Sequence, residues 1–179
     1  MVNPKQLLHF YLIVVLRRSE IYLLVFCALL IIAARQTSEP PTAETDESVP
    51  VVLSKTDSLI LMAESLLGVP YRFAGKQPNG FDCSGFTRYV YRQVGTPIAA
   101  SARNQFNQGI AISADQSQPG DLIFFASGSK VSHVGIVSNR KAEKTYFIHA
   151  STSRGVVTDC LEDPYFQQRL AGLRRMLPE

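Results

Sequence analysis

Apolar residues recur every three or four positions from residue 59 to residue 67, as they do along one face of a helix. Just before this run, Ser54 is followed three residues later by Asp57, a spacing that resembles the capping box at the start of a helix. The motif Gly68-Val69-Pro70 then interrupts the periodicity, because glycine and proline rarely continue a helix. These features predict a first helix that ends at this motif.

A second helix is predicted from about residue 84 to residue 94, with apolar residues on one face and Gly95 as its stop. The segment 71–81, which precedes it, holds two glycines, a proline and an asparagine, a composition typical of a loop. The boundary between the loop and the helix therefore places Asp82 or Cys83 at the cap position.

After the turn motif Pro119-Gly120 the apolar runs become short and rich in β-branched and aromatic residues, which predicts strands. The predicted strands cover residues 122–126, 133–138, 145–150, 156–157 and, more weakly, 170–177. Helices come first and strands follow, so the expected fold class is α+β, with N-terminal helices packed on a central antiparallel β-sheet. This domain is expected to cover residues 54–179.

The first 35 residues are expected to form a signal peptide or a membrane anchor. They hold two apolar runs, at 7–16 and 21–34, and neither reaches the roughly 18 to 20 residues that span a bilayer unaided. The second run has arginines before it and small residues at its end, as secretory signals do. We expect export to the periplasm or cell envelope. The leader is then either cleaved off or kept as an anchor at the inner membrane, or the true start of the protein lies further downstream. Residues 36–53 are polar, acidic and proline-bearing, and are expected to be a disordered linker.

The formal net charge of +3 comes from the leader rather than from the predicted domain. Residues 1–35 hold four basic residues and one acidic residue, and the remaining chain holds 14 of each. A nucleic-acid-binding domain would carry its basic surplus on the folded part, where it neutralises phosphates. We therefore expect no nucleic-acid partner.

The position of Cys83 predicts a reactive thiol. At a helix N-terminus the unpaired backbone N–H groups and the helix dipole favour the thiolate, which is the nucleophilic form. A cysteine nucleophile also needs a base that takes its proton and returns it to the leaving group. Outside the leader the chain has two histidines, His133 and His149.

A hairpin between the second and third predicted strands would bring these histidines together. If residues 139–144 form the connection and the register is centred on Lys141, His133 lies directly opposite His149 on the same face of the sheet. One imidazole then orients the other, and the second nitrogen of the oriented ring faces Cys83. A register slip of one position would weaken this prediction.

Three other interpretations of Cys83 were weighed. An isolated cysteine often simply packs in a core, although its position at a loop-to-helix boundary disfavours this. A zinc site with His133 and His149 as further ligands lacks close ligand spacing and a nearby carboxylate, so we expect no metal and no other cofactor. A disulfide would need Cys160, which we interpret as a small buried residue or a free thiol.

Five short motifs together resemble the NlpC/p60 family of cell-wall cysteine peptidases, and they occur in the family's order. They are Gly68-Val69-Pro70-Tyr71, Gly80-Phe81-Asp82-Cys83-Ser84-Gly85-Phe86, Gln118-Pro119-Gly120-Asp121-Leu122-Ile123-Phe124-Phe125, His133-Val134-Gly135-Ile136-Val137 and Phe147-Ile148-His149-Ala150-Ser151. The resemblance implies a papain-like fold and a peptidoglycan endopeptidase that acts on murein stem peptides. The expected bond joins D-glutamate to a diamino acid or forms the cross-link between peptides.

The resemblance also implies roles for single residues. Cys83 is expected to be the nucleophile, His133 the base and His149 the third member that orients the base. Tyr71 resembles the family tyrosine that faces the cysteine and helps to bind the substrate or its oxyanion. Asp82 and Ser84 resemble the pair that binds the free amino end of the stem peptide.

Two motifs depart from the family pattern. Ala74-Gly75 stands where the family often has paired glycines, and Ala99-Ala100 stands where it often has Pro-Arg. Both border the expected cleft, so the choice between stem peptide and cross-link stays open. The alternatives are a papain-like amidase or acyltransferase that acts on another amide, and an inactive wall-binding module. A monomer is expected.

Overall fold

Residues 53–177 are described by the structure, which is a computed structural model. They belong to a compact unit that spans Val52–Glu179. The predicted signal peptide or anchor at 1–35 lies outside the described residues, as does almost all of the predicted linker at 36–53. Between residues 53 and 177, no helix is long and apolar enough to cross a membrane.

The first helix, α2 (Lys55–Glu64), begins as the sequence predicts. Ser54 is its N-cap, and its hydroxyl oxygen accepts a hydrogen bond from the backbone N–H of Asp57 at 3.0 Å. The carboxylate of Asp57 accepts in turn from the backbone of Ser54, so the capping box is confirmed. The helix ends four residues before Gly68, because Leu66 and Leu67 donate to carbonyls three residues back in a tightened last turn.

The second helix, α3 (Cys83–Gln93), is also confirmed, with Asp82 as its N-cap. The loop before it contains a short hairpin of β1 (Lys76–Gln77) and β2 (Gly80–Phe81) that the sequence did not predict. Gly95 follows the helix with a positive φ of 71°, as expected for a glycine stop.

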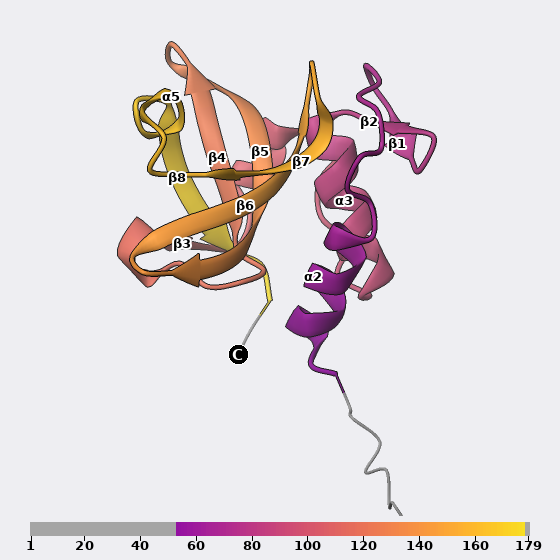
Figure 1. Cartoon of the computed structure of the whole chain (residues 1–179), viewed down its shortest axis with the longest axis horizontal. Helices are drawn as coiled ribbons and strands as arrows, with labels where there is room; N and C mark the ends of the chain where they lie inside the picture. Colours follow the sequence, from indigo (N-terminus) through magenta and orange to yellow (C-terminus); the bar gives the residue numbers. More distant parts are fainter. Residues whose placement is uncertain (1–52, 178–179) are drawn as a thin grey trace, which may run out of the picture. The chain divides into compact units, whose positions relative to one another are not determined.

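A six-stranded antiparallel sheet forms the second half of the domain (Figure 1). In spatial order its strands are β3 (Ile110–Ile112), β8 (Leu170–Arg175), β4 (Leu122–Ser127), β5 (Lys130–Lys141), β6 (Lys144–Ser151) and β7 (Gly155–Cys160). All five predicted strands are present. The sequence missed β3 and the short helices α4 (Ala102–Phe106), η1 (Ala114–Gln116) and α5 (Pro164–Gln167).

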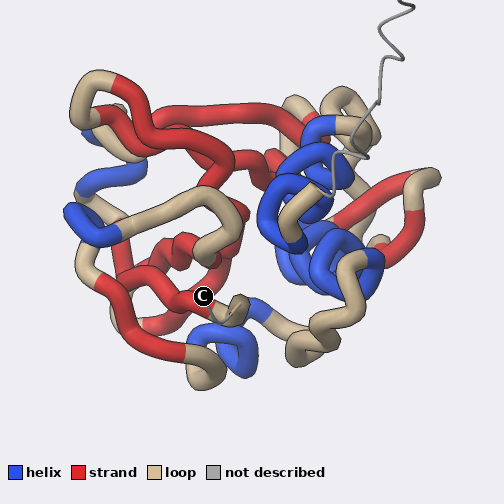
Figure 2. Tube along the Cα trace, turned by 90° about the horizontal axis from the view of Figure 1, so that it is seen from below, coloured by secondary structure: helices blue, strands red, loops and turns tan. Residues whose placement is uncertain are grey.

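The core has two layers, one on each face of the sheet. Alternate residues of β4 separate between them: Leu122 and Phe124 pack with the residues of α2 and α3, whereas Ile123 and Phe125 pack with Phe166 of α5. In Figure 2 the helices α2 and α3 lie together beside the strands. The predicted α+β class, with N-terminal helices packed on an antiparallel sheet, is confirmed.

The hairpin of β5 and β6 has a different register from the predicted one. Its turn contains only Ala142 and Glu143, both with positive φ, and Val137 pairs with Phe147. Ser138 is an extra residue on β5, and continuing the register beyond it places Gly135 opposite His149. The prediction that His133 lies directly opposite His149 is therefore wrong by two positions. An even slip keeps both histidines on the same face of the sheet.

Candidate active site

Cys83 is the first residue of α3, where Asp82 holds the start of the helix. The Oδ1 atom of Asp82 accepts hydrogen bonds from the backbone N–H of Gly85 at 2.6 Å and from the hydroxyl of Ser84 at 3.0 Å. Position 85 requires glycine, because a Cβ there would collide with the carbonyl oxygen of Gly75 in the preceding loop. The loop and the helix start therefore pack in direct contact, which fixes the position of the thiol.

The structure corrects one expectation about this thiol. Burial raises the pKa of Cys83, the nearby Asp82 raises it further, and backbone N–H groups, first that of Val134, oppose these effects only in part. The helix N-terminus alone was expected to favour the thiolate. Burial outweighs it, so in the free protein the thiol is protonated at neutral pH and needs a base.

A β-bulge lies in β5 immediately before His133. Phe125 of β4 pairs with His133, but the next residue of β4 pairs with Val131, so Ser132 is an extra residue on β5. The sulfur of Cys83 lies 3.9 Å from the carbonyl oxygen of Ser132, immediately before His133. Bulges commonly redirect side chains beside active sites, and this one joins α3 to the strand that carries the histidine.

The two histidines contact one another diagonally across β5 and β6. Nε2 of His133 lies 2.7 Å from Nδ1 of His149. Gly135, which is opposite His149, leaves the space for this contact, since a Cβ there would lie 3.1 Å from the Cβ of His149 and 2.9 Å from the ring of Phe147. The structure thus brings the histidines together as predicted, by a different register from the predicted one.

Two residues of this site were missed by the sequence analysis. Nε2 of His149 lies 2.8 Å from Oδ2 of Asp159, and Arg154 forms a two-armed ion pair with the same carboxylate. In β7, Val157 pairs with His149, so Asp159 two residues later lies on the same face. The alternation of Val157 and Asp159 was visible in the sequence, but the pairing of β7 with β6 was not.

Burial keeps both imidazoles neutral. It lowers the pKa of His133 from 6.5 to about 4, with the neighbouring His149 as the second cause. Burial also lowers the pKa of His149, although Asp159 acts in the opposite direction. The pKa of Asp159 is lowered despite its own burial, because Arg154 and His149 donate hydrogen bonds to the carboxylate. At neutral pH the cluster therefore holds two neutral rings, a carboxylate and a guanidinium.

Tyr71 lies close to the thiol, as the sequence predicts. Its phenol has a raised pKa, first because of burial and then because of the nearby Cys83 and Asp82. It therefore remains an O–H donor at neutral pH. The chain bends back here, since Tyr71 forms an isolated bridge with Phe81 just before the helix. The predicted substrate-binding residues Tyr71, Asp82 and Ser84 thus gather around Cys83.

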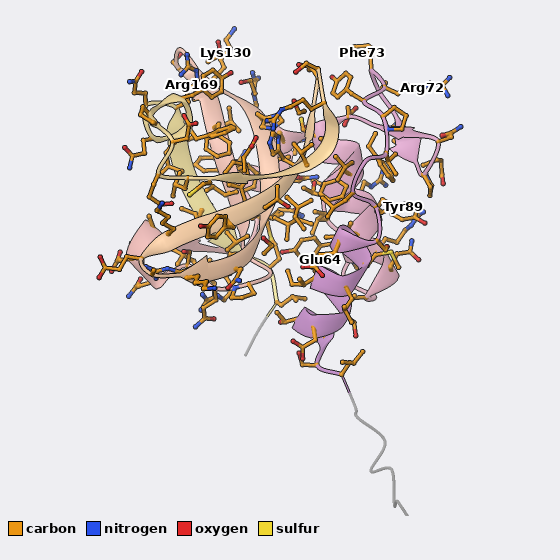
Figure 3. The ribbon with its side chains drawn as sticks, viewed as in Figure 1. Glu64, Arg72, Phe73, Tyr89, Lys130 and Arg169 are labelled. Carbon is orange, nitrogen blue, oxygen red and sulfur yellow. The ribbon has the colours of Figure 1, made fainter. Side chains whose placement is uncertain are left out.

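A cavity of about 700 Å³ lies beside the imidazoles. Its lining comes from the sheet, from the β6–β7 turn and from the α5 region, and includes His133, His149, Arg154, Asp159, Tyr165 and Arg169. In Figure 3, Arg169 and Lys130 lie at one end of the molecule, and Arg72 and Phe73 lie at the same end on the helical side. Phe73 is 87% exposed, which is unusual for a large apolar side chain.

The rival interpretations of the cysteines have different outcomes. Within the described residues, Cys83 and Cys160 are both free thiols of intermediate burial, and no disulfide joins them. Cys160 donates a hydrogen bond to Glu162 at 3.0 Å. No group of three or more potential ligands among residues 53–177 is arranged to hold a metal ion.

A thiol at the start of a packed helix, together with paired imidazoles on an antiparallel sheet, is typical of the papain-like cysteine hydrolases. A sequence model described as the NlpC/P60 family matches residues 68–175. The chain belongs to the NlpC/P60 family, and it is a cysteine peptidase, as the resemblance implied.

Individual relatives agree with this assignment. The chain is 34% identical to "Probable endopeptidase NlpC" of Escherichia coli K12 over 84% of its own length and 99% of that protein. It is 38% identical to "Murein DD-endopeptidase MepS/Murein LD-carboxypeptidase" of the same strain, over 62% of this chain and 57% of that protein. A crystal structure of an NlpC/P60 family protein from Bacillus cereus ATCC 10987 matches with a TM-score of 0.64 and 36% identity, over 69% of this chain and 40% of that chain.

Proposed function

We propose that this protein is a peptidoglycan endopeptidase that cleaves murein stem peptides with Cys83 as nucleophile, His133 as general base and His149 as the residue that orients His133. The bond is the one from D-glutamate to a diamino acid, or the cross-link between peptides. The observation that carries the proposal is the 2.7 Å distance between the two imidazoles. His133 lies on β5, and the carbonyl oxygen of the bulge residue Ser132 just before it lies 3.9 Å from the sulfur of Cys83.

The first half of the reaction forms a thioester. Nδ1 of His133 takes the proton of the Cys83 thiol while the sulfur attacks the carbonyl carbon of the substrate amide, and the carbonyl electron pair moves to oxygen. Collapse of this intermediate breaks the C–N bond, and the departing amine takes the proton from His133. A neutral imidazole with a low pKa suits a general base that must be unprotonated before each turnover.

The second half uses water. His133 accepts a proton from the water that attacks the thioester carbon, the C–S bond breaks, and the thiol recovers its proton. In this mechanism the backbone N–H groups at the start of α3 and the O–H of Tyr71 would donate hydrogen bonds to the developing oxyanion. The sum of both halves is hydrolysis of one amide bond to an amine and a carboxylate.

The remaining groups are assigned to substrate binding. The carboxylate of Asp82 and the hydroxyl of Ser84 would bind the free amino end of the stem peptide, a cation. Asp82 already caps α3 through Oδ1, so its charge is held in a fixed position next to Cys83. The cavity on the sheet side of His133 would accept the part of the substrate beyond the scissile bond.

We place the protein in the periplasm or cell envelope, because residues 21–34 resemble a secretory signal and peptidoglycan lies outside the inner membrane. An uncleaved leader would anchor it to that membrane. Protease added to cells with opened outer envelopes should digest the domain. Protection of the domain from this protease would contradict export.

The test of the activity is incubation of the full-length protein with defined muropeptides, followed by mass spectrometry of the products. The parent protein should yield products that correspond to cleavage of one kind of peptide bond. Cys83→Ala should yield no such products while keeping the parent's circular dichroism spectrum. Cys160→Ala is the matched control, since Cys160 lies outside the proposed site, and it should keep full activity. Equal activity in the parent and in Cys83→Ala would overturn the proposal.

A further inference from the structure

We propose that Asp159, held by Arg154, is a positioning residue that fixes which nitrogen of each imidazole carries its proton, and so keeps Nδ1 of His133 free for the thiol. This inference rests on the proposed function. It extends the site from three residues to a continuous chain that runs from α3 across three adjacent strands to a carboxylate.

The inference follows from what each group can donate and accept. A carboxylate only accepts hydrogen bonds, so the 2.8 Å contact with Asp159 requires a proton on Nε2 of His149. A neutral ring protonated at Nε2 has its lone pair at Nδ1, which must then accept from Nε2 of His133 across 2.7 Å. His133 is thereby left with its own lone pair at Nδ1, the nitrogen that the proposed mechanism uses.

Arg154 makes the carboxylate a fixed reference point. Its two terminal nitrogens reach both oxygens of Asp159, one of them at 3.1 Å, so the carboxylate cannot rotate away from His149. The side chain of Asp159 is 17% exposed and that of His149 is 4% exposed, so water has little access to their contact. Arg154 itself is 54% exposed and closes the cluster on the solvent side.

The alternative is that Asp159 and Arg154 form an ordinary ion pair that only stabilises β7. Such a pair would be satisfied without any contact to an imidazole. His133, His149 and Asp159 instead lie diagonally on one face of β5, β6 and β7. In this arrangement both nitrogens of His149 and Nε2 of His133 each have one hydrogen-bond partner. The two interpretations differ in what the loss of the acceptor at position 159 does.

In Asp159→Asn, the amide oxygen is expected to take the place of Oδ2, because that oxygen faces both Nε2 of His149 and a terminal nitrogen of Arg154, and both are donors. His149 then still donates from Nε2, so the parent tautomers are retained although the negative charge at position 159 is lost. Asp159→Ala removes the acceptor and leaves the donor Arg154 beside Nε2 of His149, so the proton of His149 moves to Nδ1. His133 must in turn accept at Nε2 and carry its proton on Nδ1, where it cannot take the proton of Cys83. A wrong tautomer of this kind lowers kcat on the order of 10² to 10⁴-fold.

The test reads the tautomers directly by NMR of the full-length protein labelled with ¹⁵N-histidine. The chain has three histidines, so His133 and His149 can be assigned with one Gln variant each. The parent and Asp159→Asn should both show the two rings protonated at Nε2. Asp159→Ala should show both rings protonated at Nδ1, with kcat reduced at least 100-fold relative to Asp159→Asn. Asp115→Asn, which removes an exposed carboxylate elsewhere, is the matched control and should match the parent.

Other results overturn the inference. A parent protein with Nδ1–H on His149, an Asp159→Ala variant that keeps the parent tautomers, or a switch of tautomers without loss of kcat would each do so. If Asp159→Ala does not fold, the spectrum of the parent still decides. If it folds, it should regain part of its activity with added formate. If the parent cleaves no muropeptide, the proposed function fails, but the spectra still test the tautomers.

Discussion

Acid is expected to destabilise the domain through His133 before the carboxylates are protonated. Burial and the neighbouring His149 lower the pKa of His133 to about 4, whereas an exposed imidazole in the unfolded chain has a pKa near 6.5. Between these values the unfolded state binds more protons than the folded state. The free energy of unfolding therefore rises with pH across this window and is lost as the pH falls through it.

The size of this loss follows from the linkage relation. For His133 alone, the free energy of unfolding should fall by about 2 kcal/mol between pH 8 and pH 5, and by about 3 kcal/mol at pH 4. The lowered pKa of His149 acts in the same direction. Asp159 does not enter above pH 5, since its pKa is lowered from 3.8 and it stays ionised, and Arg154 stays charged throughout.

The assay is urea unfolding of the parent and of His133→Asn at pH 8 and at pH 5. An asparagine does not titrate, so the variant should lose about 2 kcal/mol less than the parent between these two pH values, whatever its stability at pH 8. Comparing the two differences removes any direct effect of the substitution. Equal acid sensitivity of the two proteins would refute the argument, because it would mean that His133 is not protected from protonation by the fold.

Three further predictions concern the backbone around the site. Ala74 is exposed and has a positive φ of 55°, which glycine adopts without strain, so Ala74→Gly should raise the free energy of unfolding by about 0.5 to 1 kcal/mol in urea titrations. A lower free energy of unfolding would contradict this strain. Replacing the β5–β6 turn by Ala142→Asn with Glu143→Gly should add about 1 kcal/mol by the same assay, because that pair favours positive φ. Gly135→Ala should cost about 1 to 3 kcal/mol and lower kcat, since its Cβ would displace His149; unchanged stability and rate would refute that contact.

The helical half of the domain could be predicted in detail because its determinants are local. The capping box at Ser54 and Asp57 and the cap at Asp82 depend on residues three apart in the sequence, and each was found where the sequence placed it. The strands could be recognised by their composition for the same reason. The short elements α4 and α5 have too few residues to show any periodicity.

The arrangement of the strands could not be predicted, because it depends on contacts between distant segments. The turn at Ala142 and Glu143 lacks the Asn-Gly or Asp-Gly pair that indicates a two-residue hairpin, so its register was placed two positions away. The bulge at Ser138 has no distinct sequence pattern. Asp159 was missed because its role exists only once β7 pairs with β6.

The last strand of the chain has a consequence for the order in which the enzyme matures. β8 pairs with β4 on one side and β3 on the other, so the final segment fills an internal place in the sheet. Until it arrives, β4 has an open edge, although β5 with His133 is already present on its other side. A chain truncated after Cys160 should therefore aggregate and lack activity, and pelleting would detect this. In a domain built in this way the sheet that carries the two histidines is complete only after β8 has paired with β4 and β3.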